Sequence, residues 1–295
     1  MYLGTIAGSL YKVDLDATQT KHVSLVINVG QPIGGVVVEA GLAYLGLRSV
    51  GGGPLIVDLN EKKVVRTIKT DGAVFGRPVV DNRTNSVYFA STGGTVYRLP
   101  LPGVRNTTVK RFPIAGRARI EAGLAVVAGA DADSSRLVVA SVDRVVRALS
   151  ATDGKQAWSS PQGKGSEASG VHLTPAAARA AGVVGVATTG CRVAALSTET
   201  RKQQWTAALG NPIRVAPVIA GTNVITANAG CVDVWKLAPP KPPEPTAVRS
   251  LYPTKCPTFQ AGSLLWDTFK IYVGTTTGQV ASMKFPVLAS EDPSG

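Results

Sequence analysis

Histidine and cysteine are scarce in this sequence, and their scarcity removes most routes to catalysis. The 295 residues include two histidines, His22 and His172, and three cysteines, Cys191, Cys231 and Cys256. The cysteines form no CxxC pair and the histidines lie far apart, so a Cys/His zinc site has no ligands at metal-binding spacing. Neither histidine lies in a recognisable nucleophile motif, which argues against a Ser-His-Asp or Cys-His centre.

We expect the three cysteines to be free thiols. Cys191 and Cys231 each follow a glycine at the same point of successive repeat units, which are defined below. Equivalent turns of neighbouring units usually lie farther apart than the roughly 7 Å Cα separation that a disulfide tolerates. Unpaired cysteines, together with the lack of a recognisable signal peptide, favour an intracellular location.

Charged residues and long apolar runs are also few. Charged residues make up 17% of the chain, whereas about 25% is typical. No apolar run reaches the roughly 18–20 residues of a membrane span. Glycine, by contrast, is frequent at 32 residues. A chain rich in glycine and valine and poor in charge is typical of many short strands joined by tight turns, and its length permits one large all-β domain.

A unit of paired strands recurs along the whole chain. Its clearest copy is LVVASVDRVVRALSATDGKQAW, residues 137–158, where Asp153-Gly154 marks a turn because glycine accepts positive φ. The first strand of the unit starts near residues 1, 43, 87, 137, 184, 224 and 271, and the second near 10, 54, 96, 146, 193, 233 and 280. Both series have spacings of 40 to 50 residues. A period of this length with several strands per unit predicts propeller blades.

Each unit contains one or two further strands. An inner strand precedes the first one at 35–39, 78–81, 124–127, 217–220 and 257–260, and an outer strand follows the second one at 23–27, 64–68, 109–112, 155–158 and 202–205. Trp158 and Trp205 hold matching positions in the outer strands, and we interpret them as side chains that pack one blade against the next. The sequence therefore predicts an all-β fold, a single seven-bladed β-propeller of four-stranded antiparallel blades over residues 1–295.

Two features depart from the repeat. Residues 239–257 begin with PPKPPEP and predict a Pro-rich inserted loop in the sixth unit, which serves either as a stiff connection or as a docking peptide for a partner. The chain also starts at Met1 directly in a first strand, and after Phe285 it offers only residues 286–290 for a missing strand. We expect either an incomplete end blade or a piece of a longer polypeptide.

The units resemble the repeat of quinoprotein-type (PQQ-like) β-propellers. That repeat runs Tyr-Val-Gly-Ser, Asp-Gly, Leu-Tyr-Ala-Leu-Asp and Thr-Gly-Lys before Trp, and its counterparts here are IYVGTTTGQVASMKF (271–285), residues 87–101 and ALSATDGKQAW (148–158). WD40 repeats fit less well, because no unit carries the Gly-His and Trp-Asp pairs. The resemblance implies a propeller and two alternative functions: a quinone- or calcium-dependent dehydrogenase, or a propeller domain appended to an adenylate-forming enzyme.

The residues needed for quinoprotein chemistry are missing. That chemistry uses carboxylates on calcium, a basic residue near the quinone and, in many members, a disulfide between adjacent cysteines, and this sequence has no adjacent cysteine pair. Asp131 and Asp133 are the nearest approach to a calcium loop, but they lack the glycine and the later glutamate of such loops. We interpret them as part of a solvated turn, and we expect no cofactor, no metal site and no catalytic residues.

The net charge of +12 has one main source, the third unit. Between Asn82 and Ile120 there are seven basic residues and no Asp or Glu. Six of them form our candidate partner-binding set: Arg98, Arg105, Lys110, Arg111, Arg117 and Arg119; the seventh is Arg83. Arginine suits bidentate contact with carboxylates or phosphates, and the few aromatic side chains favour an acidic protein over single-stranded nucleic acid.

The alternative is a solvated rim whose charge only keeps the protein soluble. Of the two interpretations, we favour a non-catalytic protein-interaction scaffold that binds acidic partner surfaces within a multi-subunit complex, with no membrane span.

Overall fold

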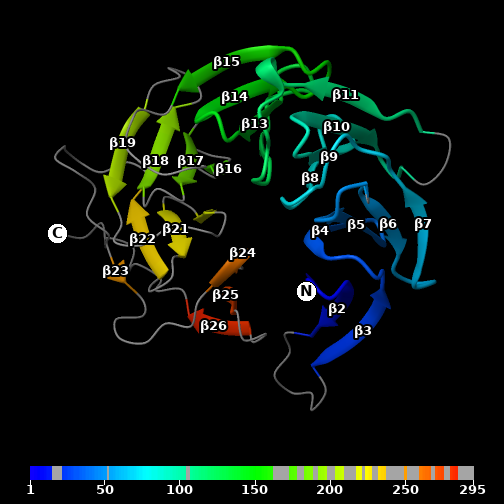
Figure 1. Cartoon of the computed structure of the whole chain (residues 1–295). Helices are drawn as coiled ribbons and strands as arrows, with labels where there is room; N and C mark the ends of the chain where they lie inside the picture. The colour runs from blue at the N-terminus through cyan, green and yellow to red at the C-terminus, as the bar shows by residue number, and fades with distance from the viewer. Residues whose placement is uncertain are drawn as a thin grey trace.

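Strands dominate the computed structural model of this chain. The structure describes most of the first half of the chain and shorter segments of the second: residues 1–14, 22–51, 53–103, 107–161, 173–177, 183–188, 192–197, 203–208, 217–220, 223–227, 232–236, 249–250, 259–266, 270–275 and 280–284. Over these residues the strands form seven antiparallel sheets, five with four strands and two with three. The sheets follow one another around a common axis (Figure 1). The all-β prediction is therefore confirmed, and the only helix in the described part is a 3-10 turn, η1 (Ala115–Arg117).

The first four sheets contain the strands as follows. The first has β1 (Tyr2–Gly4), β2 (Ser9–Val13) and β3 (Val23–Asn28). The second has β4 (Ile33–Glu39), β5 (Leu42–Leu47), β6 (Leu55–Asp58) and β7 (Lys63–Thr67). The third has β8 (Val79–Asp81), β9 (Ser86–Ala90), β10 (Thr95–Pro100) and β11 (Lys110–Pro113). The fourth has β12 (Ala125–Val127), β13 (Arg136–Ala140), β14 (Val145–Ser150) and β15 (Gln156–Pro161).

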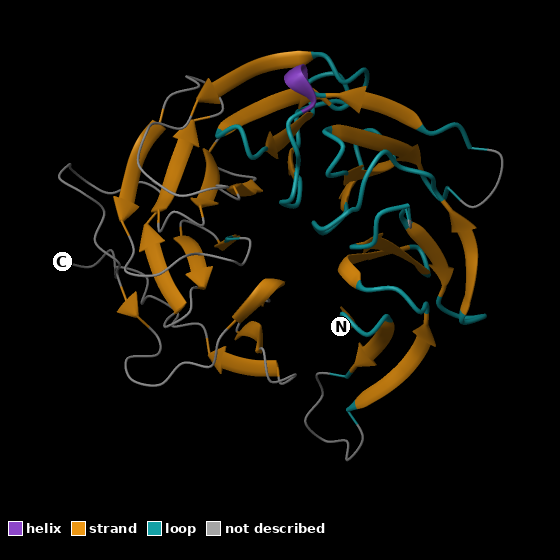
Figure 2. Ribbon diagram, viewed as in Figure 1, coloured by secondary structure: helices purple, strands orange, loops and turns teal. Residues whose placement is uncertain are grey.

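The last three sheets continue the same order. The fifth has β16 (Leu173–Ala177), β17 (Val183–Thr188), β18 (Arg192–Ser197) and β19 (Gln203–Ala208). The sixth has β20 (Val218–Ala220), β21 (Asn223–Ala227), β22 (Val232–Lys236) and β23 (Arg249–Ser250). The seventh has β24 (Phe259–Trp266), β25 (Lys270–Thr275) and β26 (Val280–Lys284). In every sheet the strand order follows the chain (Figure 2).

A tight turn connects β9 to β10 in the third sheet. Between β9 and β10, the amide of Ser91 donates to the carbonyl of Thr95 and the amide of Gly94 donates to the carbonyl of Ser91. Gly94 has a φ of 76°, a left-handed conformation that glycine adopts without a Cβ clash. The glycine at this turn is therefore a requirement of the hairpin geometry.

The hydrophobic core lies between neighbouring sheets and depends on strands that are buried on both faces. All five residues of β9 are buried. Val87 and Phe89 pack toward the second sheet, whereas Tyr88 and Ala90 pack toward the fourth. Because successive side chains of a strand point to opposite faces, one apolar strand supplies both interfaces. This explains why the middle strands are almost continuously hydrophobic.

Tryptophans contribute to the same kind of interface in the later sheets. Trp158 on β15 is 8% exposed and packs in a cluster that includes Leu196 of the fifth sheet. Trp205 on β19 stacks on Trp235 of the sixth sheet, with ring centroids 6.5 Å apart. The interpretation of Trp158 and Trp205 as inter-sheet packing residues is confirmed.

A hydrogen bond between sheets occurs twice at equivalent places. The hydroxyl of Tyr44 on β5 donates to the carbonyl of Pro102, at 2.8 Å. The hydroxyl of Tyr88 on β9 donates to the carbonyl of Ala151, at 2.7 Å. Each carbonyl belongs to the turn after the third strand of the next sheet. Burial raises the pKa of Tyr44 to about 12, with a smaller contribution from the carboxylate of Glu39, so this hydroxyl stays protonated as a donor.

Two strands have no counterpart among the sequence predictions. β16 contains Pro175, which weakens a strand pattern, but inner strands lie at the edge of their sheet, where a missing N–H is tolerated. β23 lies within residues 239–257, the predicted Pro-rich loop, and pairs with β22 over two residues. The rest of that loop, the three cysteines and Arg105 lie outside the described residues.

Candidate functional site

The outer strand of the third sheet, β11, carries Lys110 and Arg111 at its start, and both are exposed. Tyr97 of β10 pairs with Arg111, whose guanidinium carbon lies 5.8 Å from the centroid of the Tyr97 ring. A cation over an aromatic face is attracted to it, which orients the Arg111 side chain. Among the described residues, no carboxylate lies within ion-pair distance of either cation. We call these two residues the β11 pair.

Arg98, another member of the predicted set, lies inside a hydrogen-bond network instead. Its Nε donates to the hydroxyl of Ser86 at 2.9 Å, and its terminal nitrogens donate to the carbonyls of Thr152 at 2.8 Å and Thr84 at 3.2 Å. Thr152 belongs to the turn that follows β14 of the fourth sheet. Arg98 therefore connects two sheets, and these contacts use three of its five N–H donors.

Arg117 and Arg119 are exposed, but each has an acidic neighbour. Arg117 lies 3.6 Å from Asp71, and Arg119 lies 2.6 Å from Glu121. Glu121 lies two residues after Arg119 in the sequence, whereas Asp71 lies 46 residues before Arg117, so only the Asp71–Arg117 pair depends on the tertiary structure. Partial neutralisation leaves the β11 pair as the strongest unpaired charge among the described members of the predicted set.

Asp71 is held in its charged form by hydroxyl groups. Burial raises its pKa, but hydrogen bonds from Ser91 and Thr95 outweigh this effect and lower the pKa overall. The Thr95 hydroxyl donates to Asp71 at 2.5 Å, and the Tyr97 hydroxyl accepts the Asp71 amide at 2.8 Å. These contacts fix the loop beside the β9–β10 turn, so the role of the carboxylate is structural.

A similar network occupies the next sheet. Arg147 on β14 is 6% exposed, and one of its terminal nitrogens lies 2.5 Å from Asp143, with another donating to the hydroxyl of Ser141 at 2.7 Å. Burial raises the pKa of Asp143, but the hydrogen bonds from Arg147 and Ser141 outweigh it and lower the pKa overall. The pair stabilises the β13–β14 turn.

Asp131 and Asp133 lie in an exposed turn. The Asp131 carboxylate accepts hydrogen bonds from the amide and the hydroxyl of Ser134, at 2.8 and 2.7 Å, and these bonds lower its pKa. This agrees with the interpretation of the segment as a solvated turn. Within the described ranges, no group of three or more His, Cys, Asp and Glu side chains is placed to hold a metal ion.

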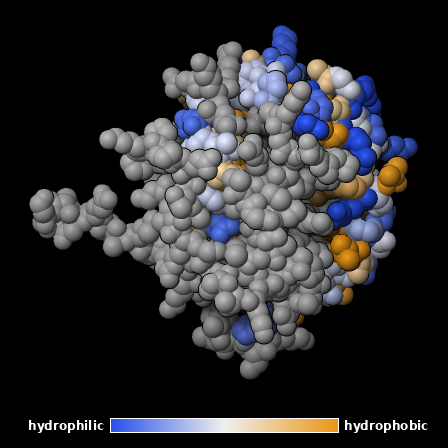
Figure 3. All heavy atoms as spheres, turned by 60° about the vertical axis from the view of Figure 1, so that its left-hand side comes forward, coloured by the Kyte–Doolittle hydropathy of each residue, from blue (hydrophilic) through white to orange (hydrophobic). Residues whose placement is uncertain are grey.

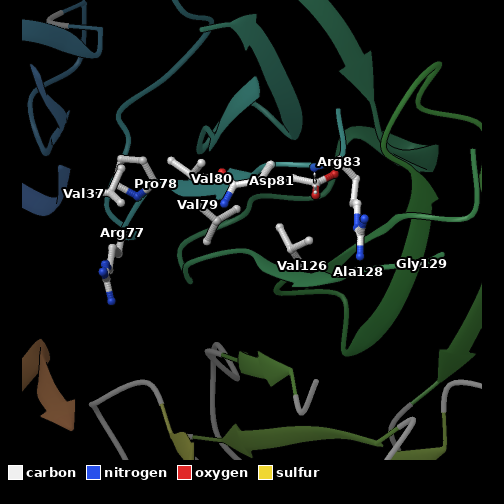
Figure 4. A pocket seen from close by; sticks show the side chains of 11 residues that line it. Val37, Arg77, Pro78, Val79, Val80, Asp81, Arg83, Val126, Ala128 and Gly129 are labelled. Carbon is white, nitrogen blue, oxygen red and sulfur yellow. Dashed lines mark hydrogen bonds between the residues drawn. The ribbon is translucent and has the colours of Figure 1, made fainter. Parts of the chain in front are cut away.

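A cavity of about 850 Å³ opens near the axis, against the inner strands β4, β8 and β12. Figure 4 shows Arg77 and Arg83, at the two ends of β8, extending toward the same open side. The sequence shows Arg83 as one of the basic residues of the third unit, but neither Arg83 nor Arg77 lies in a motif that indicates binding. Both arginines flank one strand, β8, and the neighbouring strands β4 and β12 complete the cavity around them.

The surface outside this cavity is mixed in character. Hydrophobic and hydrophilic side chains alternate in small groups on the described part of the face drawn in Figure 3. Among the described side chains, five large hydrophobic ones are exposed to solvent: Ile6, Val23, Leu25, Val50 and Val64. No helix in the described part is both long and apolar enough to cross a membrane.

The antiparallel sheets are arranged around one axis as in a β-propeller. Residues 142–239 match the family model described as outer membrane protein assembly factor BamB, which confirms the resemblance to quinoprotein-type repeats over this third of the chain. A search of curated proteins found no match.

Solved structures with the same fold come from varied sources. BamB from Moraxella catarrhalis is 14% identical, with a TM-score of 0.65 over 97% of this chain and 93% of that one. The computationally designed Ika8 protein is 13% identical, with a TM-score of 0.68 over 96% and 80%. A chain of the mitotic checkpoint complex is 11% identical, with a TM-score of 0.75 over 96% and 86%. At these identities the similarity establishes the fold alone.

Proposed function

We propose that this protein is a non-catalytic interaction scaffold that binds an acidic protein surface through the rim of its third blade. The observation that carries the proposal is the β11 pair, Lys110 and Arg111, two exposed cations on an outer strand. Exposed cations without acidic partners attract an oppositely charged surface and accelerate its association. Arg111 also presents a guanidinium suited to a carboxylate.

The other predicted residues have lesser roles in this proposal. The side chains of Arg117 and Arg119 are exposed. A partner carboxylate can therefore compete with Asp71 and Glu121 for the two guanidinium groups. Surface ion pairs of this kind contribute only about 0–1 kcal/mol, so exchanging them costs little. Arg98 maintains the blade interface beneath the binding surface.

A complete seven-bladed ring is part of the same proposal. The seven sheets, of which the first and last have three strands, are the seven blades. The similarity of a chain in the mitotic checkpoint complex and of BamB, an assembly factor by its description, supports a role within a multi-protein assembly. Propellers provide rigid rims for such contacts, whereas fold by itself does not fix the partner.

Charge reversal of the β11 pair tests the proposal. The full chain is titrated with poly-L-glutamate, and binding is measured by fluorescence anisotropy at low salt. We expect the K110E/R111E variant to bind about tenfold or more weakly, because two attractive contacts become repulsive. The matched control is K63E/K69E, which makes the same charge change on exposed residues at either end of β7 in the neighbouring blade.

Equal weakening by both variants would mean that only net charge matters, which contradicts the assignment. The same titration with a dT12 oligonucleotide separates partner classes. If the oligonucleotide binds more tightly than poly-L-glutamate and depends on the same two residues, the acidic-protein proposal is wrong.

A further inference from the structure

The axial cavity contains two cations at opposite ends of one strand. Arg77 precedes β8 and Arg83 follows it, and both line the cavity together with apolar side chains that include Val79 and Val126. Its volume of about 850 Å³ is within the range of roughly 300–1,000 Å³ that is usual for binding sites. Figure 4 shows both guanidinium groups on the open side, away from the sheet that carries them.

Both arginines are available to an anion. The Nε of Arg77 donates to the carbonyl of Val36 at 3.1 Å, which fixes the side chain and leaves its terminal nitrogens toward the cavity. Burial lowers the pKa of Arg77, but an arginine stays charged at neutral pH. Among the described residues, neither arginine has a carboxylate within ion-pair distance.

Asp81 is the acidic residue of the cavity wall, and its carboxylate is directed into its own turn. It accepts the amide of Arg83 at 3.0 Å and the hydroxyl of Thr84 at 2.9 Å, and its residue is 2% exposed. Its charge offsets part of the positive potential, but its oxygens are occupied. A ligand therefore meets the two guanidinium groups first.

The spacing of the two cations determines the shape of the ligand. β8 covers only Val79–Asp81, and Figure 4 shows the guanidinium groups of Arg77 and Arg83 apart from each other, at its two ends. Two separated cations suit a ligand that carries two separate carboxylates. Val79 and Val126 are half-buried between the cations, and an apolar wall disfavours the continuous phosphate backbone of a nucleic acid. An extended segment with two acids separated by apolar residues fits both features.

We propose that the axial cavity binds an extended acidic peptide segment of a partner protein, with one carboxylate on Arg77 and a second on Arg83. Both this site and the proposed site on the rim of the third blade are expected to bind an acidic protein, but they have no residue in common. The cavity uses different strands, β8 and β12 rather than β11. The two proposals therefore fail independently.

The test measures anisotropy of the fluorescein-labelled peptide Gly-Glu-Val-Gly-Val-Glu-Gly, whose acids are four residues apart, with the full chain. We expect saturable binding, loss of binding when both Glu are replaced by Gln, and about tenfold weakening by Arg77→Gln or Arg83→Gln. Arg144→Gln, on an exposed turn of the fourth sheet, is the matched control and should not change the affinity.

Each other outcome overturns the proposal. Failure of the peptide to bind, or binding that neither arginine variant weakens, removes the site. Displacement by equimolar citrate would identify a small polycarboxylate as the ligand, and displacement by equimolar dT6 would identify a nucleic acid. If Arg77→Gln loses the native circular dichroism spectrum, Arg83→Gln decides the outcome, because Arg83 is an exposed turn residue.

Discussion

Replacing Tyr88 by phenylalanine removes a single oxygen from the interface between the third and fourth sheets. That oxygen lies 2.7 Å from the carbonyl of Ala151 and 2.7 Å from the hydroxyl of Thr84, and Tyr88 and Ala151 are both 0% exposed. The lost hydrogen bond contributes about 1 kcal/mol net, and the buried carbonyl left without its donor costs about 1–2 kcal/mol more. We expect Tyr88→Phe to lower the free energy of unfolding by about 2–3 kcal/mol.

Urea unfolding, followed by tryptophan fluorescence, measures this loss as a lower midpoint at unchanged slope. Tyr11→Phe is the control, because Tyr11 is half-buried and its hydroxyl is not hydrogen-bonded to any described residue; we expect a change within about 0.5 kcal/mol. If Tyr88→Phe and Tyr11→Phe lower the midpoint equally, the hydrogen bond between sheets does not contribute as argued.

Three further predictions concern pH, packing and charge. The pKa of Tyr44 is raised from 10.0 to about 12, so the contribution of its protonated hydroxyl to stability is present below pH 10 and is lost as the pH rises toward 12. Between pH 10 and pH 12, the urea midpoint of Tyr44→Phe should therefore fall less with rising pH than that of the wild-type protein. A Cβ on Gly76 would lie 2.4 Å from the Cα of Gly123, whereas a Cβ on Gly123 meets nothing nearer than 3.4 Å. Gly76→Ala should therefore lower the thermal midpoint and Gly123→Ala should leave it nearly unchanged. Asp143→Ala leaves the buried Arg147 without its carboxylate partner and should lower the free energy of unfolding by about 3 kcal/mol, the low end for a buried pair because Asp143 is partly exposed. Adding Arg147→Met should recover stability, and a double variant as unstable as the single one would contradict the charge argument.

The repeat was predictable from the sequence because its signals are local. Short apolar strands and glycine turns recur at 40 to 50 residues, and most strands lie where those signals place them. β16 and β23 were missed because one contains a proline and the other is only two residues long. Their pairing depends on neighbouring strands more than on their own residues.

The candidate sites were only partly predictable. The third unit is basic in sequence, but a count of charges along the chain does not show which are paired. Asp71 and Glu121 come from outside the acid-free stretch to meet Arg117 and Arg119. Arg98 turns inward to the carbonyl of Thr152 in the neighbouring sheet.

The sequence by itself determined the all-β class, the period of the repeat and the apolar strands, because turn chemistry and side-chain alternation act over a few residues. Only the tertiary structure decided which cations are free. Asp71 meets Arg117, and Arg98 meets Thr152, only in the folded chain. Folding also forms the cavity beside Arg77 and Arg83 and leaves Lys110 and Arg111 exposed on the rim.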